Sequence, residues 1–294
     1  MLKELSRLFH PKAKRDSLNF LDVDSEDLQI HGNVIDQIFE EKIDGIIIRN
    51  FLQDEEVKLL LDNYLTIPLS EQFCTGEGIH TFPESFSSLN DEAKSQEELI
   101  KNGRFWSSFE SKFGIDYIAK IKTLFLSLSS FDLVDVPLDK ANPSKLYNPS
   151  TFRQLSPNSG ELKLHCGRFF HENFPNFYKV LEKISDIHHQ LSYFVSLRPA
   201  MEGGKLKVFP VKWEEANNKV DEMILERADK SIIDLEDQQQ VEGSNLNLNA
   251  GDLLLFKGSN IWHQVSPIKG SVSRCTLGSF ISRSKKSNQL HIWS

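Results

Sequence analysis

The stretch Gly160-Glu-Leu-Lys-Leu-His-Cys-Gly-Arg-Phe-Phe170 combines the alternating pattern of a strand with a histidine and a nearby glycine. Successive side chains of an extended strand point to opposite faces. His165 and position 167 are therefore expected on one face, and Leu164 and Cys166 on the other. Two positions on one face can carry neighbouring metal ligands, but glycine at position 167 supplies none. A metal site here needs ligands from elsewhere in the chain.

A second histidine and an arginine follow in predicted strands. His263 lies nearly a hundred residues after His165, and Arg274 comes eleven residues later with Thr276 on the same face. The order His-x-Asp/Glu, distant His and then Arg is typical of iron enzymes with a double-stranded β-helix. In these enzymes two imidazoles and a carboxylate hold Fe(II) and leave three positions open. The arginine pairs with the far carboxylate of 2-oxoglutarate.

The wider pattern predicts an α+β fold with a predominantly β core, a jelly-roll or cupin-like double-stranded β-helix with surrounding helices. Apolar periodicity indicates helices at 54–65, capped by Asp54, at 117–128 and at 177–184. Strands are indicated at 45–49, 161–169, 191–197, 205–209, 252–256, 261–265 and 274–281, with a tight turn at Gly203-Gly204. We expect a loose segment over 1–17 and a single domain over 18–294. A charged helical insertion at about 213–240 could act as a lid.

Composition narrows the class of protein. The 294 residues, 39% of them hydrophobic, can bury a substantial core. A formal charge of -8 disfavours nucleic acids and anionic membranes as partners. Three cysteines without a CxxC pair favour a reduced, cytoplasmic location. The longest apolar runs fall far short of the roughly 20 residues that a membrane helix needs.

Short motifs from residue 18 to the end, in the same order, resemble the freestanding hapalindole and welwitindolinone alkaloid halogenases. The early motifs are Leu18-Asn-Phe-Leu-Asp22 and Asp44-Gly-Ile-Ile-Ile-Arg49. The later ones are Leu191-Ser-Tyr-Phe194, Gly203-Gly-Lys-Leu206, Gly251-Asp-Leu-Leu-Leu-Phe256 and Ile292-Trp-Ser294, together with the spacing of His263 and Arg274.

The resemblance implies a non-haem iron, 2-oxoglutarate-dependent aliphatic halogenase in which His-x-Gly replaces His-x-Asp. His165 and His263 would hold Fe(II), Arg274 and Thr276 would bind 2-oxoglutarate, and chloride or bromide would bind beside Gly167. With O2, such an enzyme chlorinates an unactivated carbon through a ferryl-chloride intermediate. A carboxylate supplies one coordination position and one negative charge, and a halide can supply both if glycine leaves room for it.

The same resemblance assigns further residues. Ser192 resembles a serine that helps steer the reactive oxygen, although a strand hydroxyl bonded to backbone is the simpler interpretation. Leu162 and the region 73–80 match segments that line the substrate pocket of the family. Glu77 and Gly78 depart from the apolar residues expected there. The substrate, a free alkaloid, terpenoid, amino acid or nucleoside without a carrier protein, therefore stays open.

Other histidines and arginines have simpler interpretations. His171 competes with His165 as first ligand, because His171-Glu-Asn173 has the same stagger, but asparagine is a poor iron ligand. His188 and His189, at the end of a predicted helix, are expected to cap it or lie on the surface. Arg153 and Arg168 could orient chloride or substrate, although surface ion pairs are the simpler interpretation.

Two other functions remain open. The first is an Fe(II)/2-oxoglutarate hydroxylase or other oxidative tailoring enzyme, with water or a substrate group at the position that glycine leaves. The second is a metal-free binding protein of the same fold, in which the glycine marks lost iron affinity. The joint presence of His165, His263 and Arg274 argues against the second.

Overall fold

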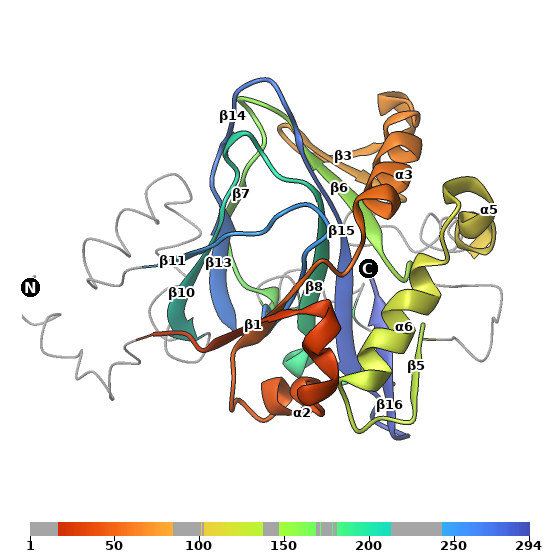
Figure 1. Ribbon diagram of the computed structural model, residues 1–294, viewed down its shortest axis with the longest axis vertical. Helices are drawn as coiled ribbons and strands as arrows, with labels where there is room; N and C mark the ends of the chain where they lie inside the picture. The colour runs from red at the N-terminus through yellow and green to blue at the C-terminus, as the bar shows by residue number, and fades with distance from the viewer. Residues whose placement is uncertain are drawn as a thin grey trace, which may run out of the picture.

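The computed structural model describes residues 17–84, 101, 103–137, 147–168, 171, 178, 181–212 and 243–294. Two β-sheets face each other in these residues, and helices cover the outside of the larger one (Figure 1). The residues 1–16 and 213–242 lie outside the described part. The loose N-terminal segment, the helical insertion and the single-domain division therefore stay predictions.

The larger sheet has ten strands. Its main path runs in the order β1 (Phe20–Asp24), β2 (Gly45–Arg49), β12 (Leu253–Phe256), β8 (Leu191–Arg198), β15 (Arg274–Arg283), β6 (Thr151–Leu155), β4 (Ile79–Phe82) and β3 (Phe73–Gly76). β16 (Gln289–Trp293) pairs with β15 and with β5 (Leu133–Asp135). Except for the parallel pairs β1–β2 and β5–β16, these pairings are antiparallel.

The smaller sheet holds the histidines. It runs in the order β11 (Ser244–Leu246), β10 (Leu206–Lys212), β13 (Ile261–Val265) and β7 (Leu162–His165). A short pair, β9 (Glu202–Gly203) and β14 (Ile268–Lys269), closes one end. Gly203 and Gly204 have φ values of 70° and 62°, which only glycine adopts readily. In place of the predicted tight turn, Gly203 ends β9 and Gly204 connects it to β10.

The alternation of β8 shows how the two layers of core arise. Tyr193, Val195 and Leu197 pack outward in the cluster formed with the helices, whereas Phe194 packs inward between the two sheets. The outer helices are α2 (Val34–Phe39), α3 (Asp54–Leu65), α5 (Phe109–Phe113) and α6 (Tyr117–Ser127). The predicted α+β double-stranded β-helix is confirmed.

Several predicted boundaries need correction. Gln53, not Asp54, is the N-cap of α3, and its backbone N–H donates to the Glu56 carboxylate at 3.0 Å. The first half of the chain contributes strands β1 to β5 as well as helices. The strand predicted over 161–169 ends at His165, because the backbone of Gly167 turns to bond elsewhere. In the helix predicted over 177–184, Tyr178 and Leu181 are helical and residues 182–184 form a turn, while 177, 179 and 180 lie outside the described residues.

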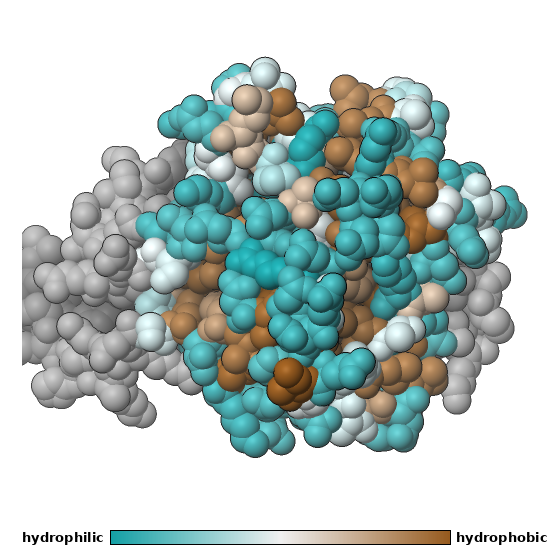
Figure 2. Space-filling view, in the orientation of Figure 1, coloured by the Kyte–Doolittle hydropathy of each residue, from teal (hydrophilic) through white to brown (hydrophobic). Residues whose placement is uncertain are grey.

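The face shown in Figure 2 mixes hydrophilic residues with small hydrophobic groups, as is normal for a globular domain. Within the described residues, the exposed large hydrophobic side chains are Ile30, Leu59, Leu65, Leu69, Leu126, Leu133 and Met201. Among the described residues, no helix is both long and apolar enough to cross a lipid bilayer.

Candidate active site

His165 and His263 face each other across two paired strands. His165 ends β7 and is the direct register partner of His263 on β13. The centroids of the two imidazole rings are 4.3 Å apart, and the ring planes are inclined by 54°. Strand pairing thus brings together two histidines that are nearly a hundred residues apart in sequence.

Both rings are held in the same way. The Nδ1 atom of His165 is 2.6 Å from the carbonyl oxygen of Lys163, and that of His263 is 2.8 Å from the carbonyl oxygen of Ile261. Because a carbonyl only accepts, each Nδ1 carries the proton and donates it. Each Nε2 then keeps its lone pair, which is the arrangement of a metal-ligating histidine.

Burial also keeps the pair neutral. It lowers the pKa of His165 to about 4, with a smaller contribution from the positive charge of Arg153. Burial lowers the pKa of His263 well below its usual value, and the neighbouring His165 adds to this. An imidazole binds a metal only in its neutral form, so both rings are ready to bind near neutral pH.

Gly167 lies in a tightly packed helical turn that follows β7. Its backbone N–H donates to the carbonyl of Gly258 at 2.8 Å, and that of Arg168 donates to the carbonyl of Ser259 at 3.1 Å. A Cβ atom at position 167 would come within 2.9 Å of both the Ser259 Cα atom and the Gln190 Nε2 atom. The position of Gly167 is therefore set by this turn, and the packing of the turn accepts no side chain without movement.

Gln190 is a residue that the sequence does not single out. It lies between the short 3-10 helix η4 (Ile187–His189) and β8, and only 1% of it is exposed. Its amide nitrogen and oxygen are buried without a hydrogen-bond partner among the described residues. Burial raises the pKa of the Tyr178 hydroxyl, and the nearby Gln190 amide opposes this rise. No hydrogen bond of normal geometry joins the Gln190 amide to the Tyr178 hydroxyl. Gln190 thus presents an unused donor beside Gly167.

Two arginines line the inner face of the larger sheet. Arg274 is buried, and its guanidinium lies 5.2 Å from the centroid of the Phe194 ring. Burial, and next the charge of Arg153, lower the pKa of Arg274 to about 10, so it remains charged at neutral pH. Arg153 is the register partner of Thr276, and this pairing places Arg153 beside Arg274. The surface ion pair expected for Arg153 from the sequence is therefore wrong.

Arg153 and Arg274 place two positive charges side by side, and a bound anion would neutralise charge there. The ion pairs found among the described residues involve other basic side chains, such as Arg49 with Asp22. Buried charges are costly unless they are paired. A dicarboxylate such as 2-oxoglutarate can supply the missing negative charge at Arg274.

The other predicted site residues divide into two groups. Ser192 is half-buried, and its hydroxyl lies against Gly258, the residue that holds the Gly167 turn. Leu162 lies on β7, where it pairs with Val265. These two are near the site, together with the buried Thr276.

Glu77 and Gly78 form the turn between β3 and β4. Glu77 is exposed, and Gly78 has a φ of 66° and a backbone packed against Ser159. No contact among the described residues joins either of them to the histidine pair. The φ value and this packing account for the glycine, and the substrate role of Glu77 and Gly78 stays a prediction.

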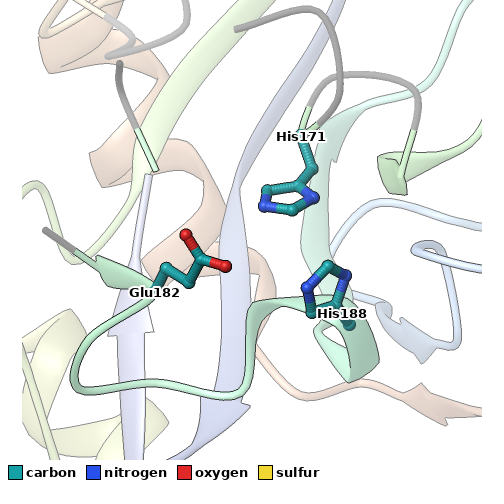
Figure 3. A group of neighbouring side chains, drawn as sticks. All are labelled: His171, Glu182 and His188. Carbon is teal, nitrogen blue, oxygen red and sulfur yellow. The ribbon is translucent and has the colours of Figure 1, made fainter. Parts of the chain in front are cut away.

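A second group of potential ligands consists of His171, Glu182 and His188 (Figure 3). One ligand atom from each lies within 4.8 Å of the other two. His189 has the expected surface role, since its ring pairs with the Asp186 carboxylate at 3.0 Å. His188, in the same last turn of η4, is half-buried, and its ring lies 4.4 Å from that of His171.

Several solved structures share the fold of this chain. A novel N-substituted L-amino acid dioxygenase from Burkholderia ambifaria AMMD has a TM-score of 0.57 and 14% sequence identity, over 87% of this chain and 89% of that chain. The structure of such a dioxygenase from the same organism in complex with alpha-KG has a TM-score of 0.54 and 17% identity, over 88% and 90% of the two chains. A search of curated proteins finds no match.

One family model covers almost the whole chain. It is described as carrier-protein-independent halogenase WelO5, and it matches residues 17–294. With the shared fold, this match supports a non-haem iron, 2-oxoglutarate-dependent enzyme. The chain belongs to the WelO5 family of carrier-protein-independent halogenases.

Proposed function

We propose that this protein is an Fe(II)/2-oxoglutarate-dependent aliphatic halogenase that chlorinates a free small molecule. The Nε2 atoms of His165 and His263 would hold the iron, and Arg274 with Thr276 would bind the far carboxylate of 2-oxoglutarate. The fit rests on the tautomer that the backbone bonds of both rings fix, with the proton on Nδ1 and the lone pair on Nε2. With 2-oxoglutarate and O2, iron supplies the oxidising power to remove hydrogen from an unactivated carbon.

The packing around Gly167 is the observation that carries the proposal. In the hydroxylase pattern the residue two after the first histidine is a carboxylate ligand. Here the Ser259 Cα atom stands 2.9 Å from where even a Cβ would lie, so no carboxylate can enter without moving backbone. The iron would then lack a third protein ligand at this position, and a halide can supply the charge and the coordination.

The Gln190 amide supports an anion beside Gly167. Its Nε2 group is buried, has no described partner and lies next to the glycine. An N–H donor without a partner is costly in the interior, and a hydrogen bond to an anion removes that cost. We assign Gln190 the role of donating to the bound halide.

The substrate is proposed as a freestanding small molecule, as the name of the family model suggests for its members. Its chemical class among alkaloids, terpenoids, amino acids and nucleosides is left to the experiment.

The experiment has two stages. Anaerobic protein is titrated with Fe(II) and 2-oxoglutarate, whose bidentate complex gives a visible charge-transfer absorption, and then with chloride, which should shift that absorption. Panels of free alkaloids, terpenoids, amino acids and nucleosides are next incubated with O2 and either chloride or bromide. Mass spectrometry should find a product that carries whichever halide was supplied.

The His263→Ala variant is the control for both stages, since it should give neither absorption nor product. Oxygenated product alone at saturating chloride would show a hydroxylase instead. Absence of any absorption in the unmodified protein would favour the metal-free binding protein.

A further inference from the structure

His171, Glu182 and His188 form a cluster of donors that the proposed halogenase site does not use. In Figure 3 the two imidazole rings lie close together and the carboxylate points toward the space beside them. The ring centroids of His171 and His188 are 4.4 Å apart, with the planes at 85°. The cluster contains no residue of the His165–His263 pair.

The donors of this cluster are available. The Nδ1 atom of His188 is buried and has no hydrogen-bond partner among the described residues. Glu182 is exposed, and neither this carboxylate nor the His171 ring is in an ion pair found among the described residues. A buried imidazole nitrogen without a partner is costly, and a bound cation would satisfy it.

The spacing fits a small divalent cation. Bonds of roughly 2.0 to 2.2 Å from zinc to nitrogen or oxygen place tetrahedral ligand atoms about 3.3 Å apart. The observed limit of 4.8 Å is wider. Side-chain rotation, for which the exposed Glu182 has room, would bring the three ligand atoms closer together around an ion.

We propose that His171, Glu182 and His188 form a second divalent-metal site, suited to Zn²⁺ and separate from the iron site. His188 lies two residues before Gln190, and His171 lies four residues after Gly167. A bound ion would join the segments that carry these two residues. The ion therefore acts as a clamp that holds together two segments beside the halide site. This clamp role rests on the proposed function, whereas zinc binding itself does not.

The test uses the full chain, stripped with a chelator, loaded with zinc sulfate and freed of excess metal by gel filtration. Elemental analysis then counts bound zinc. The His165→Ala/His263→Ala variant, which lacks the proposed iron ligands, should keep one zinc per chain. Adding His188→Ala or Glu182→Gln to it should remove that zinc, and adding His189→Ala, the matched neighbour, should not.

Two further measurements separate the sites. In the otherwise unmodified chain, His188→Ala should keep the Fe(II)–2-oxoglutarate absorption, and His165→Ala should lose it. In the variant without iron ligands, zinc should slow amide hydrogen exchange over residues 181–190, as expected for a clamp.

Three results would overturn the proposal. The first is a variant without iron ligands that retains no zinc. The second is a His188→Ala addition that leaves zinc binding unchanged. The third is loss of the iron absorption in His188→Ala with retention in His165→Ala, which would move the iron to the cluster. Unchanged exchange would refute the clamp.

Discussion

Gly167 shows at the scale of one residue how packing and chemistry can demand the same amino acid. The sequence argument asks for glycine because a halide needs room. The structure adds that a Cβ at this position would press on the Ser259 Cα atom and on the Gln190 amide. Substitution therefore has a structural cost as well as a chemical one.

Replacing Gly167 with Asp should abolish the chloride-dependent change in the iron absorption, since the new carboxylate takes the place of the halide. Because the Ser259 backbone must move, the free energy of unfolding should also fall by about 1–3 kcal/mol. Urea unfolding and chloride titration measure the two effects. Where the turn yields enough to permit ligation, the product should change from chlorinated to hydroxylated.

Gly32 offers a matched control, because an added Cβ there meets no atom within 4 Å. Gly32→Ala should leave both chloride binding and stability close to those of the unmodified protein. Undiminished halogenation by the Gly167→Asp variant would contradict the argument that glycine provides the halide position.

Replacing Gln190 with Leu keeps most of the volume and removes the donor. A hydrogen bond to a charged group contributes about 1.5–3 kcal/mol, so the Kd for chloride should rise roughly ten- to hundredfold. The 2-oxoglutarate absorption should remain. The control is Gln154→Leu, because Gln154 lies one residue beyond Arg153 and on the opposite face of β6. This variant should not alter the Kd for chloride. Equal Kd values in the Gln190→Leu and Gln154→Leu variants would show that Gln190 does not contact the halide.

At the scale of elements, strand pairing assembles the site. The antiparallel register of β7 and β13 places His165 opposite His263, and that of β15 and β6 places Thr276 opposite Arg153. Alternation along β15 then puts Arg274 on the same inner face as Thr276. One sheet thus supplies the metal ligands and the other the positive charge.

Replacing Arg274 with Gln should raise the Kd for 2-oxoglutarate by about ten- to hundredfold, because charge-assisted hydrogen bonds to its carboxylate are lost. Arg274→Lys should recover only part of the affinity, since an ammonium group lacks the planar fork. Titration of the charge-transfer absorption measures both.

Arg198→Lys is the matched control for Arg274. The Arg198 side chain bonds to the carbonyl and hydroxyl oxygens of Ser273, so this variant should bind 2-oxoglutarate normally. An Arg274→Gln variant with unchanged affinity would place the carboxylate elsewhere, and Arg153 would be the next candidate.

At the scale of the whole molecule, the pair formed by the half-buried His165 and the buried His263 links stability to pH. The pKa of His165 falls from 6.5 to about 4 on folding, chiefly through burial. The unfolded chain therefore binds more protons between these values, and stability is lost as the pH falls from about 6.5 toward 4. This penalty applies to the metal-free protein.

The His165→Asn variant, which cannot titrate here, should lose less stability on acidification. Between pH 7 and pH 5 the difference from the unmodified protein should be about 2 kcal/mol. Urea unfolding of both metal-free proteins at the two pH values gives this number. Equal losses would mean that His165 is not held neutral by burial.

The sequence by itself determined much of the fold and the chemical type of the site. Period-two alternation identified most of the central strands, and β2 and β13 have the predicted bounds. His165, His263 and Arg274 could be singled out because their spacing and residue types are local information. Very short strands such as β9 and β14 were missed, because two residues carry no detectable periodicity.

Only the tertiary structure decided how the region around Gly167 is packed. The Gly167 turn depends on backbone bonds to Gly258 and Ser259, some ninety residues away, and Gln190 reaches it from a third segment. The inward position of Arg153 and the approach of His188 to His171 also depend on distant parts of the chain. Alternation along a strand fixes which face a side chain occupies, whereas contacts between strands and turns require the register that long-range packing sets.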